Sequence, residues 1–99
     1  MAEVTIVYWR DIPAQVIVGK GRRGAKVQLP ERFEQAIDRA AMKTGADGTD
    51  DYLAEWRKAQ VETAFTGADM DIAKAQAEAL DREYDIDRIK ALIANDGWA

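Results

Sequence analysis

The sequence feature that most constrains the fold is a change of hydrophobic period at Pro30. Before Pro30, apolar and polar residues alternate with a period of two, as side chains do along a β-strand. After Pro30, apolar residues recur every three or four positions, as they do on one face of an α-helix. This order predicts an α+β domain in which a small sheet is followed by helices that pack on one of its faces.

The N-terminal part predicts a three-stranded antiparallel β-meander. Residues 4–9 are almost all β-branched or aromatic, which indicates a central strand. Residues 10–13 are typical of a turn, because Pro13 has a fixed φ and cannot donate to a central ladder. Residues 15–18 and 25–29 supply the second and third strands, since short connections favour antiparallel neighbours.

About four helices are predicted after the strands. The first begins at Pro30, carries a buried stripe, and ends at Gly45, which can adopt a left-handed cap. The others are expected to begin after three N-cap residues, Thr49, Asp69 and Asp85.

Two regions of the helical part carry further expectations about the fold. The second helix is expected to bury Tyr52, Leu53 and Trp56. Residues 60–66 fit either a short strand or a continued helix. The predicted organisation is a single domain over residues 1–99.
Within that domain, residues 1–29 are expected to be β-rich and residues 30–99 helical.

The chain has no cysteine, histidine or serine, which removes most of the usual catalytic groups. A metal would have to bind through oxygen ligands alone, and the aspartates do not match a calcium loop. Aspartates before helices are already explained by capping. We therefore predict no catalytic residue, no metal site and no cofactor.

Charge is distributed unevenly along the chain. The whole chain carries a net charge of −4, with a pI near 4.8. Residues 1–29 hold five basic and two acidic residues and so carry +3, which leaves −7 for residues 30–99. The acidic body argues against nucleic-acid binding, and no segment predicts a signal peptide or a membrane span. A soluble, cytoplasmic protein is expected.

Residues 19–24 match the pattern G-x-G-x-x-G, which in dinucleotide-binding units joins a strand to a helix. Here a strand follows instead, so the pattern does not predict a dinucleotide site. It fits a hairpin tip whose glycines permit positive φ. The basic side chains at this tip could alternatively bind a phosphate or an acidic partner; they are Lys20, Arg22, Arg23 and Lys26.

The three tryptophans lead to different expectations. Trp9 and Trp56 lie in apolar patterns and are expected in the core. Trp98 either folds back onto the domain or docks on a partner, because interfaces are rich in tryptophan. The turn that contains Trp9, Arg10 and Asp11 is a second candidate contact with a partner.

Through residues 7–16, 26–29, 32–33 and 52–56, the sequence resembles the small bacterial "virulence factor" domain family, closely over residues 1–60 and loosely beyond them. This domain also occurs as a segment of the larger conserved virulence factor C proteins. The resemblance implies no enzymatic activity and no catalytic motif. It implies an association with virulence in larger relatives, and with corrinoid and folate methyl transfer for short alphaproteobacterial members.

The sequence therefore supports two hypotheses of different classes. The first is a non-enzymatic accessory or adaptor protein that binds a larger protein. The alternative is a small module in which the basic hairpin, residues 19–26, binds a phosphate-bearing ligand. A homodimer is compatible with both, since a small sheet leaves an exposed edge.

Overall fold

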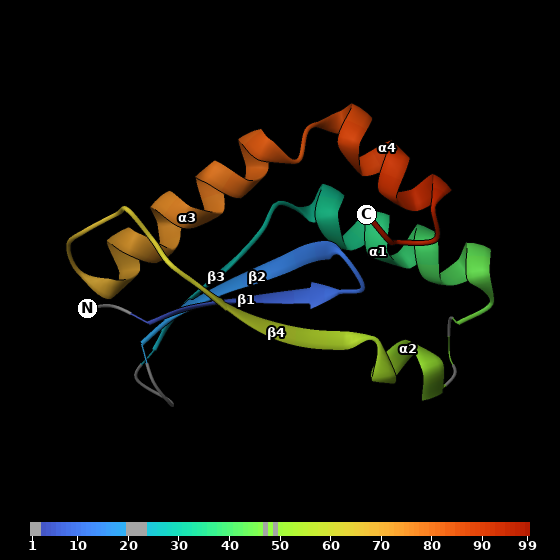
Figure 1. The fold of residues 1–99 in the computed structure, drawn as a ribbon, viewed down its shortest axis with the longest axis horizontal. Helices are drawn as coiled ribbons and strands as arrows, with labels where there is room; N and C mark the ends of the chain where they lie inside the picture. Colours follow the sequence, from blue (N-terminus) through green and yellow to red (C-terminus); the bar gives the residue numbers. More distant parts are fainter. Residues whose placement is uncertain (1–2, 20–23, 47, 49) are drawn as a thin grey trace.

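The computed structural model describes residues 3–19, 24–46, 48 and 50–99. These residues form a four-stranded antiparallel sheet and four helices (Figure 1). The predicted α+β class is confirmed. The predicted number of strands was wrong, because a fourth strand pairs with the free edge of the first.

The sheet has the strand order β3-β2-β1-β4, and each neighbouring pair is antiparallel. Its strands are β1 (Val4–Trp9), β2 (Ile12–Val18), β3 (Ala25–Gln28) and β4 (Trp56–Val61). The first three strands form the predicted meander. β1 is central, as its apolar character on both faces predicts.

The strand β4 lies in the part of the chain that we expected to be helical. The second helix, α2 (Asp50–Ala54), ends before Trp56, and Trp56 instead pairs with Trp9 of β1. β4 carries Arg57 and Lys58, and charged residues have weak strand propensity but suit an edge strand. Residues 56–61 therefore form a strand because they pair with β1, and not because of their local propensity. β4 ends at Val61, and residues 62–66 form no helix or strand.

The β1–β2 hairpin is tighter than predicted. Only Arg10 and Asp11 form the turn, and Pro13 belongs to β2, where it faces Tyr8. The register shifts between Val7 and Tyr8, which marks a bulge. Proline is tolerated at a bulge, because its missing N–H removes no regular ladder bond there.

The helix α1 (Glu31–Thr44) follows Pro30 and ends at Gly45, whose φ of 75° gives the predicted left-handed cap. Its buried residues are the predicted stripe, Phe33, Ala36, Ile37, Ala40 and Ala41. Helix α3 (Asp69–Glu83) begins at Asp69 itself, so Asp69 is not the predicted N-cap. Helix α4 (Ile86–Ala94) has the predicted cap, since Asp85 accepts a hydrogen bond from the Arg88 amide at 2.8 Å.

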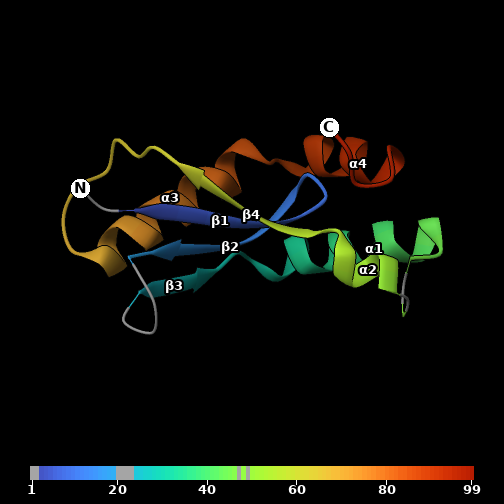
Figure 2. The same cartoon turned by 60° about the horizontal axis from the view of Figure 1, so that its bottom comes forward.

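The core lies between the sheet and the helices α1, α3 and α4, which are on the same side of the sheet (Figure 1). The inner face of the sheet contributes Val4, Ile6, Val16 and Val18, all at most 2% exposed. Figure 2 shows the opposite face of the sheet, with α3 behind the strands and α2 at one end. Among the described residues, no long helix covers this second face.

We expect Asp85→Ala to lower the free energy of unfolding by about 1 kcal/mol, because it removes the side-chain cap of α4. The matched control is Asp87→Ala, which removes a carboxylate from the same helical turn but leaves the cap. The control should cost roughly 0.3 kcal/mol. Urea denaturation measures both, and equal losses would contradict the capping role.

Candidate functional site

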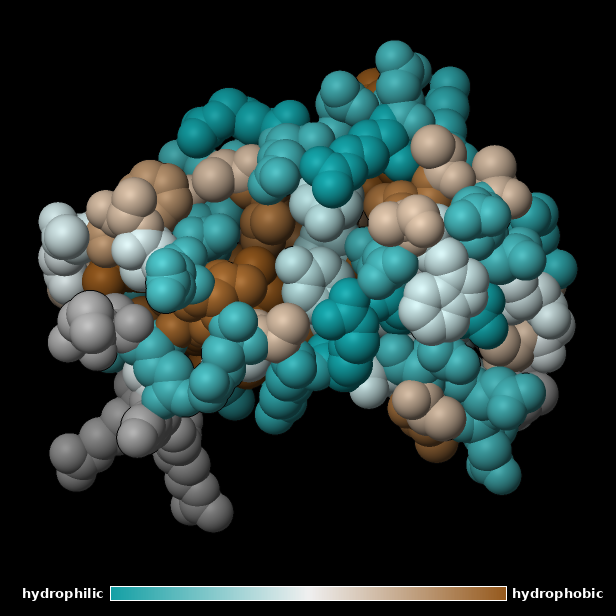
Figure 3. All heavy atoms as spheres, viewed as in Figure 1, coloured by the Kyte–Doolittle hydropathy of each residue, from teal (hydrophilic) through white to brown (hydrophobic). Residues whose placement is uncertain are grey.

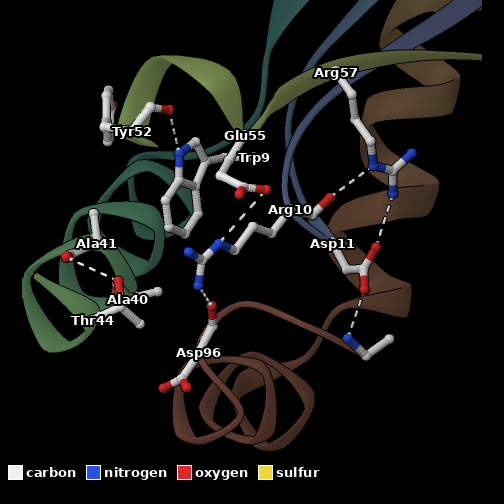
Figure 4. A network of polar contacts seen from close by, with 11 residues as sticks. Trp9, Arg10, Asp11, Ala40, Ala41, Thr44, Tyr52, Glu55, Arg57 and Asp96 are labelled. Atoms are coloured by element: carbon white, nitrogen blue, oxygen red, sulfur yellow. Dashed lines mark hydrogen bonds and ion pairs between the residues drawn. The ribbon is translucent and has the colours of Figure 1, made fainter. Parts of the chain in front are cut away.

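The hairpin turn between β1 and β2 holds the C-terminal residues against the domain (Figure 4). The Arg10 Nη1 donates to the Asp96 carbonyl at 2.6 Å, and the Asp11 amide donates to the Gly97 carbonyl at 2.8 Å. The Ala99 amide donates to Asp11 Oδ2 at 2.7 Å. We call these contacts between the turn and residues 96–99 the tail clasp.

Arg10 lies at the centre of the tail clasp. Its guanidinium is 4.7 Å from the ring centroid of Trp9 and 5.4 Å from that of Trp98, within the range of cation–π attraction. Its side chain is only 13% exposed, and its Nε lies 3.9 Å from a carboxylate oxygen of Glu55. Trp98 therefore folds back onto the domain, although 43% of it remains exposed.

Two further cations connect the tail clasp to the rest of the fold. Arg57 of β4 donates to the Arg10 carbonyl and to Asp11 Oδ1, both at 2.9 Å. Lys43 of α1 donates to Asp96 Oδ1 at 2.7 Å. The predicted partner-binding residues Arg10 and Asp11 are thus engaged inside the molecule.

Trp9 is completely buried, as the sequence predicted for a core residue. Its indole N–H donates to the Tyr52 carbonyl at 2.9 Å, which ties α2 to β1. A partner cannot reach this ring in the folded state, although the sequence also placed Trp9 in a candidate contact turn.

Of the predicted basic residues, Lys20, Arg22 and Arg23 lie outside the described residues. Lys26 is described and is exposed on the edge strand β3, where it pairs with Ile17 of β2. Ile17 is six residues along the chain from Asp11, which is a distance of about 20 Å in a strand. Lys26 therefore does not share one site with the tail clasp.

The open face of the sheet, which we define as the face opposite α3, has two rows of paired side chains. In the first row, the register partners on β3, β2, β1 and β4 are, in that order, Lys26, Ile17, Thr5 and Gln60. The next row is Gln28, Gln15, Val7 and Lys58. Thr5, Val7, Gln15 and Ile17 are half-buried, and the outer residues are exposed. The centre of this face is partly apolar and its rim is polar and basic.

A hollow of about 190 Å³ lies at the α2 end of the open face; we call it the aromatic hollow. Its walls include Tyr52 and Trp56, whose ring centroids are 6.0 Å apart at an angle of 83°. Its other lining residues are Val7, Ala14, Gln15, Gln28, Leu29, Glu34, Ile37 and Asp38. The hollow thus combines an apolar floor, two aromatic rings and two carboxylates.

A second, wider hollow of about 820 Å³ lies where the chain passes from β4 to α3. Its apolar residues are Val61, Phe65 and Ile72, and Glu62 and Asp69 are at its rim. Figure 3 shows apolar side chains on the surface between α3 and β4, left of centre. This hollow is open and holds no group that predicts a particular ligand.

The structure adds two findings on metals and membranes. No group of three or more acidic residues within the described ranges is close enough to hold a metal ion. None of the helices in the same ranges is both long and apolar enough to span a bilayer.

Burial raises the pKa of the Tyr8 phenol above its usual value of 10.0. Tyr84, followed by Glu83 and Asp11, raises this pKa further, because ionised neighbours repel the phenolate. Arg57, whose guanidinium lies 4.4 Å from the Tyr8 ring centroid, acts in the opposite direction. Tyr8 is therefore neutral across the physiological range and belongs to the packing of the domain.

Sequence reasoning missed the aromatic hollow. Tyr52 and Trp56 were assigned to one buried helical face, whereas the chain leaves the helix between them and both remain partly exposed. Glu34 and Asp38 are four residues apart on the solvent side of α1, beside the buried Ile37. That spacing was a usable signal for paired carboxylates, but only the tertiary structure brings them to the aromatic rings.

The fold and its surface define a small α+β protein whose antiparallel sheet is covered by long helices on one side and open on the other. The chain belongs to the Virulence factor family, which it matches over residues 7–93. The resemblance seen in the sequence is thereby confirmed. Neither a curated protein nor a solved structure matches the chain.

The tail clasp predicts that a side chain at Gly97 is costly. A Cβ at Gly97, where φ is 93°, would lie 3.1 Å from Trp9 Cζ3 and 3.2 Å from Arg10 Cδ. Gly45 is the matched control, because its φ of 75° is also positive but a Cβ there meets nothing within 4 Å. We expect Gly45→Ala to cost about 1 kcal/mol from backbone strain alone, and Gly97→Ala clearly more.

Chemical denaturation measures both losses, and hydrogen exchange of residues 95–99 reports release of the tail. Equal costs for the two variants, with unchanged exchange at the tail, would contradict a tight approach of Gly97 to Trp9.

The raised pKa of Tyr8 predicts a loss of stability in alkali. Above pH 10 the unfolded chain releases the Tyr8 proton while the folded chain retains it, so the free energy of unfolding falls as pH rises. The loss continues until the pH passes the folded-state pKa. Tyr8→Phe should make this alkaline slope shallower, as measured by denaturation between pH 9 and 11. An unchanged slope would contradict the burial of the phenol.

Proposed function

We propose that this protein is a non-enzymatic accessory protein that binds a larger protein through the open face of its sheet. The observation that carries the proposal is the uncovered face itself. The central residues Val7 and Ile17 are half-buried and apolar, and no long helix of the described chain covers the face on which they lie. A partly apolar centre with a polar rim is the usual composition of a non-obligate protein interface.

The residue inventory supports an accessory role. The chain lacks the imidazole, thiol and seryl groups that supply most general bases and nucleophiles. Tyr8, which has a raised pKa, is packed beside Tyr84 and Arg57 and is not in either hollow. Binding therefore explains the surface better than turnover does.

The structure changes the predicted contact surface. Arg10 and Asp11 stabilise the tail clasp, and of the three predicted contact residues Arg10, Asp11 and Trp98 only Trp98 is exposed. The open face replaces the hairpin turn as the proposed contact. Lys26 remains part of it, since it is exposed beside Ile17.

The alternative of a phosphate-binding hairpin rests on Lys20, Arg22 and Arg23. Because these residues lie outside the described part of the chain, that alternative stays a prediction.

The test compares two apolar-to-acidic variants. Ile17→Glu places a carboxylate in the centre of the open face. Lys26, its register partner on β3, offsets the new negative charge. Ile86→Glu is the control, because Ile86 is 65% exposed on α4, in the helical layer. We expect a partner identified from native complexes, then purified, to lose about 30-fold in affinity with Ile17→Glu and to be unaffected by Ile86→Glu.

Calorimetric titration of the purified pair gives both affinities, and sedimentation of the chain alone reports whether a second copy occupies the face. Equal effects of the two variants would contradict binding through the open face. Steady turnover of a substrate by the isolated chain would overturn the accessory role.

A further inference from the structure

We propose that the aromatic hollow binds the cationic end of one side chain, an arginine or a lysine, that the partner protein presents to the open face. This inference rests on the proposed function, because it names the chemistry by which the partner is recognised. Arginine is the preferred occupant, since its planar guanidinium can stack on an aromatic face and pair with carboxylates at once.

The aromatic walls provide the first half of the argument. Tyr52 and Trp56 both line the hollow, and their rings are nearly perpendicular, with centroids 6.0 Å apart. Two perpendicular rings leave a corner in which a cation lies within reach of both π systems. No hydrogen bond connects the Trp56 indole N–H to another described residue.

The charges at the rim provide the second half. Glu34 and Asp38 are one helical turn apart on α1, so their carboxylates lie on the same face of the helix. Within the described part of the chain, neither carboxylate forms an ion pair or a hydrogen bond. Other carboxylates of this small chain, such as Asp81 and Asp96, are paired with Arg32 and Lys43.

The same hollow excludes an anion and disfavours a large cofactor. Its acidic residues repel a phosphate, and its volume of about 190 Å³ is below the roughly 300–1,000 Å³ of typical small-molecule sites. A single long side chain fits this space. Val7, Leu29 and Ile37 can pack against the methylene groups of that side chain, while its charged end reaches the rim.

The position of the hollow favours a protein as the source of the cation. Val7 and Gln15 line the hollow and also belong to the open face, so an inserted side chain is continuous with an interface there. Glu34 and Asp38 lie on the α1 side of the hollow, whereas Lys58, the register partner of Val7, lies on its β4 side and Lys26 lies on β3. Such a division of charge fixes the orientation of a bound partner.

The test uses blocked arginine, Nα-acetyl-L-arginine methylamide, as the probe, with the matching citrulline compound as the neutral control. In ¹H–¹⁵N spectra, we expect arginine to shift the Trp56 indole and the Gln15 and Gln28 side-chain amides in a saturable way. The citrulline compound, which has the same shape without the charge, should not. The double variant E34Q/D38N should weaken arginine binding about tenfold.

The control variant is Glu62→Gln, which removes an exposed carboxylate just after β4, at the opposite end of that strand from Trp56. Both Glu34 and Asp38 are exposed, so their amide variants should fold normally, and a thermal melt verifies this. We expect Glu62→Gln to bind blocked arginine as the unmodified chain does.

Several outcomes would overturn the inference. Equal shifts with arginine and citrulline would show that charge is not recognised, and no shift at all would show that the hollow is not a site. Tighter binding of spermidine than of blocked arginine would assign the hollow to a free polyamine instead of a partner. In each case, the loss of partner binding in Ile17→Glu would still decide separately whether the open face binds a protein.

Discussion

The burial of Trp9 is the constraint on which the rest of this structure depends. Its ring is fully enclosed at the end of the central strand. Its indole N–H holds the backbone of α2 at Tyr52, and its register partner Trp56 starts the fourth strand. The Gly97 backbone approaches the same ring so closely that a methyl group there would lie only 3.1 Å from Trp9 Cζ3. One buried side chain thus positions a helix, a strand and the chain end.

The same arrangement divides the surface into a part that stabilises the fold and a sheet face that no long helix of the described chain covers. Arg10 and Asp11 are engaged with the C-terminal residues through hydrogen bonds to the Asp96 carbonyl and from the Ala99 amide. On the other side, β4 and α2 form one boundary of the open face and bring Trp56 and Tyr52 to its edge. The aromatic hollow therefore exists because Trp9 anchors the elements that form it.

The differences between sequence and structure are concentrated where tertiary contacts override local preference. The stripe on α1 and the caps at Gly45 and Asp85 were predictable, since each depends on residues within a few positions. The strand β4 was not, because Arg57 and Lys58 have little strand propensity and the strand forms only beside β1. The hollow was missed for the same reason, as its carboxylates and rings come from separate elements.

The sequence by itself determined the fold class, the limits on chemistry and the family, because these follow from hydrophobic period, residue inventory and local motifs. Only the tertiary structure decided which face of the sheet remains open. Only the tertiary structure also decided that Arg10 holds the C-terminal residues against the domain. It also brought Glu34 and Asp38 beside two aromatic rings. The physical reason is range: periodicity and capping act within one or two turns of chain, whereas a surface is assembled from residues far apart in sequence.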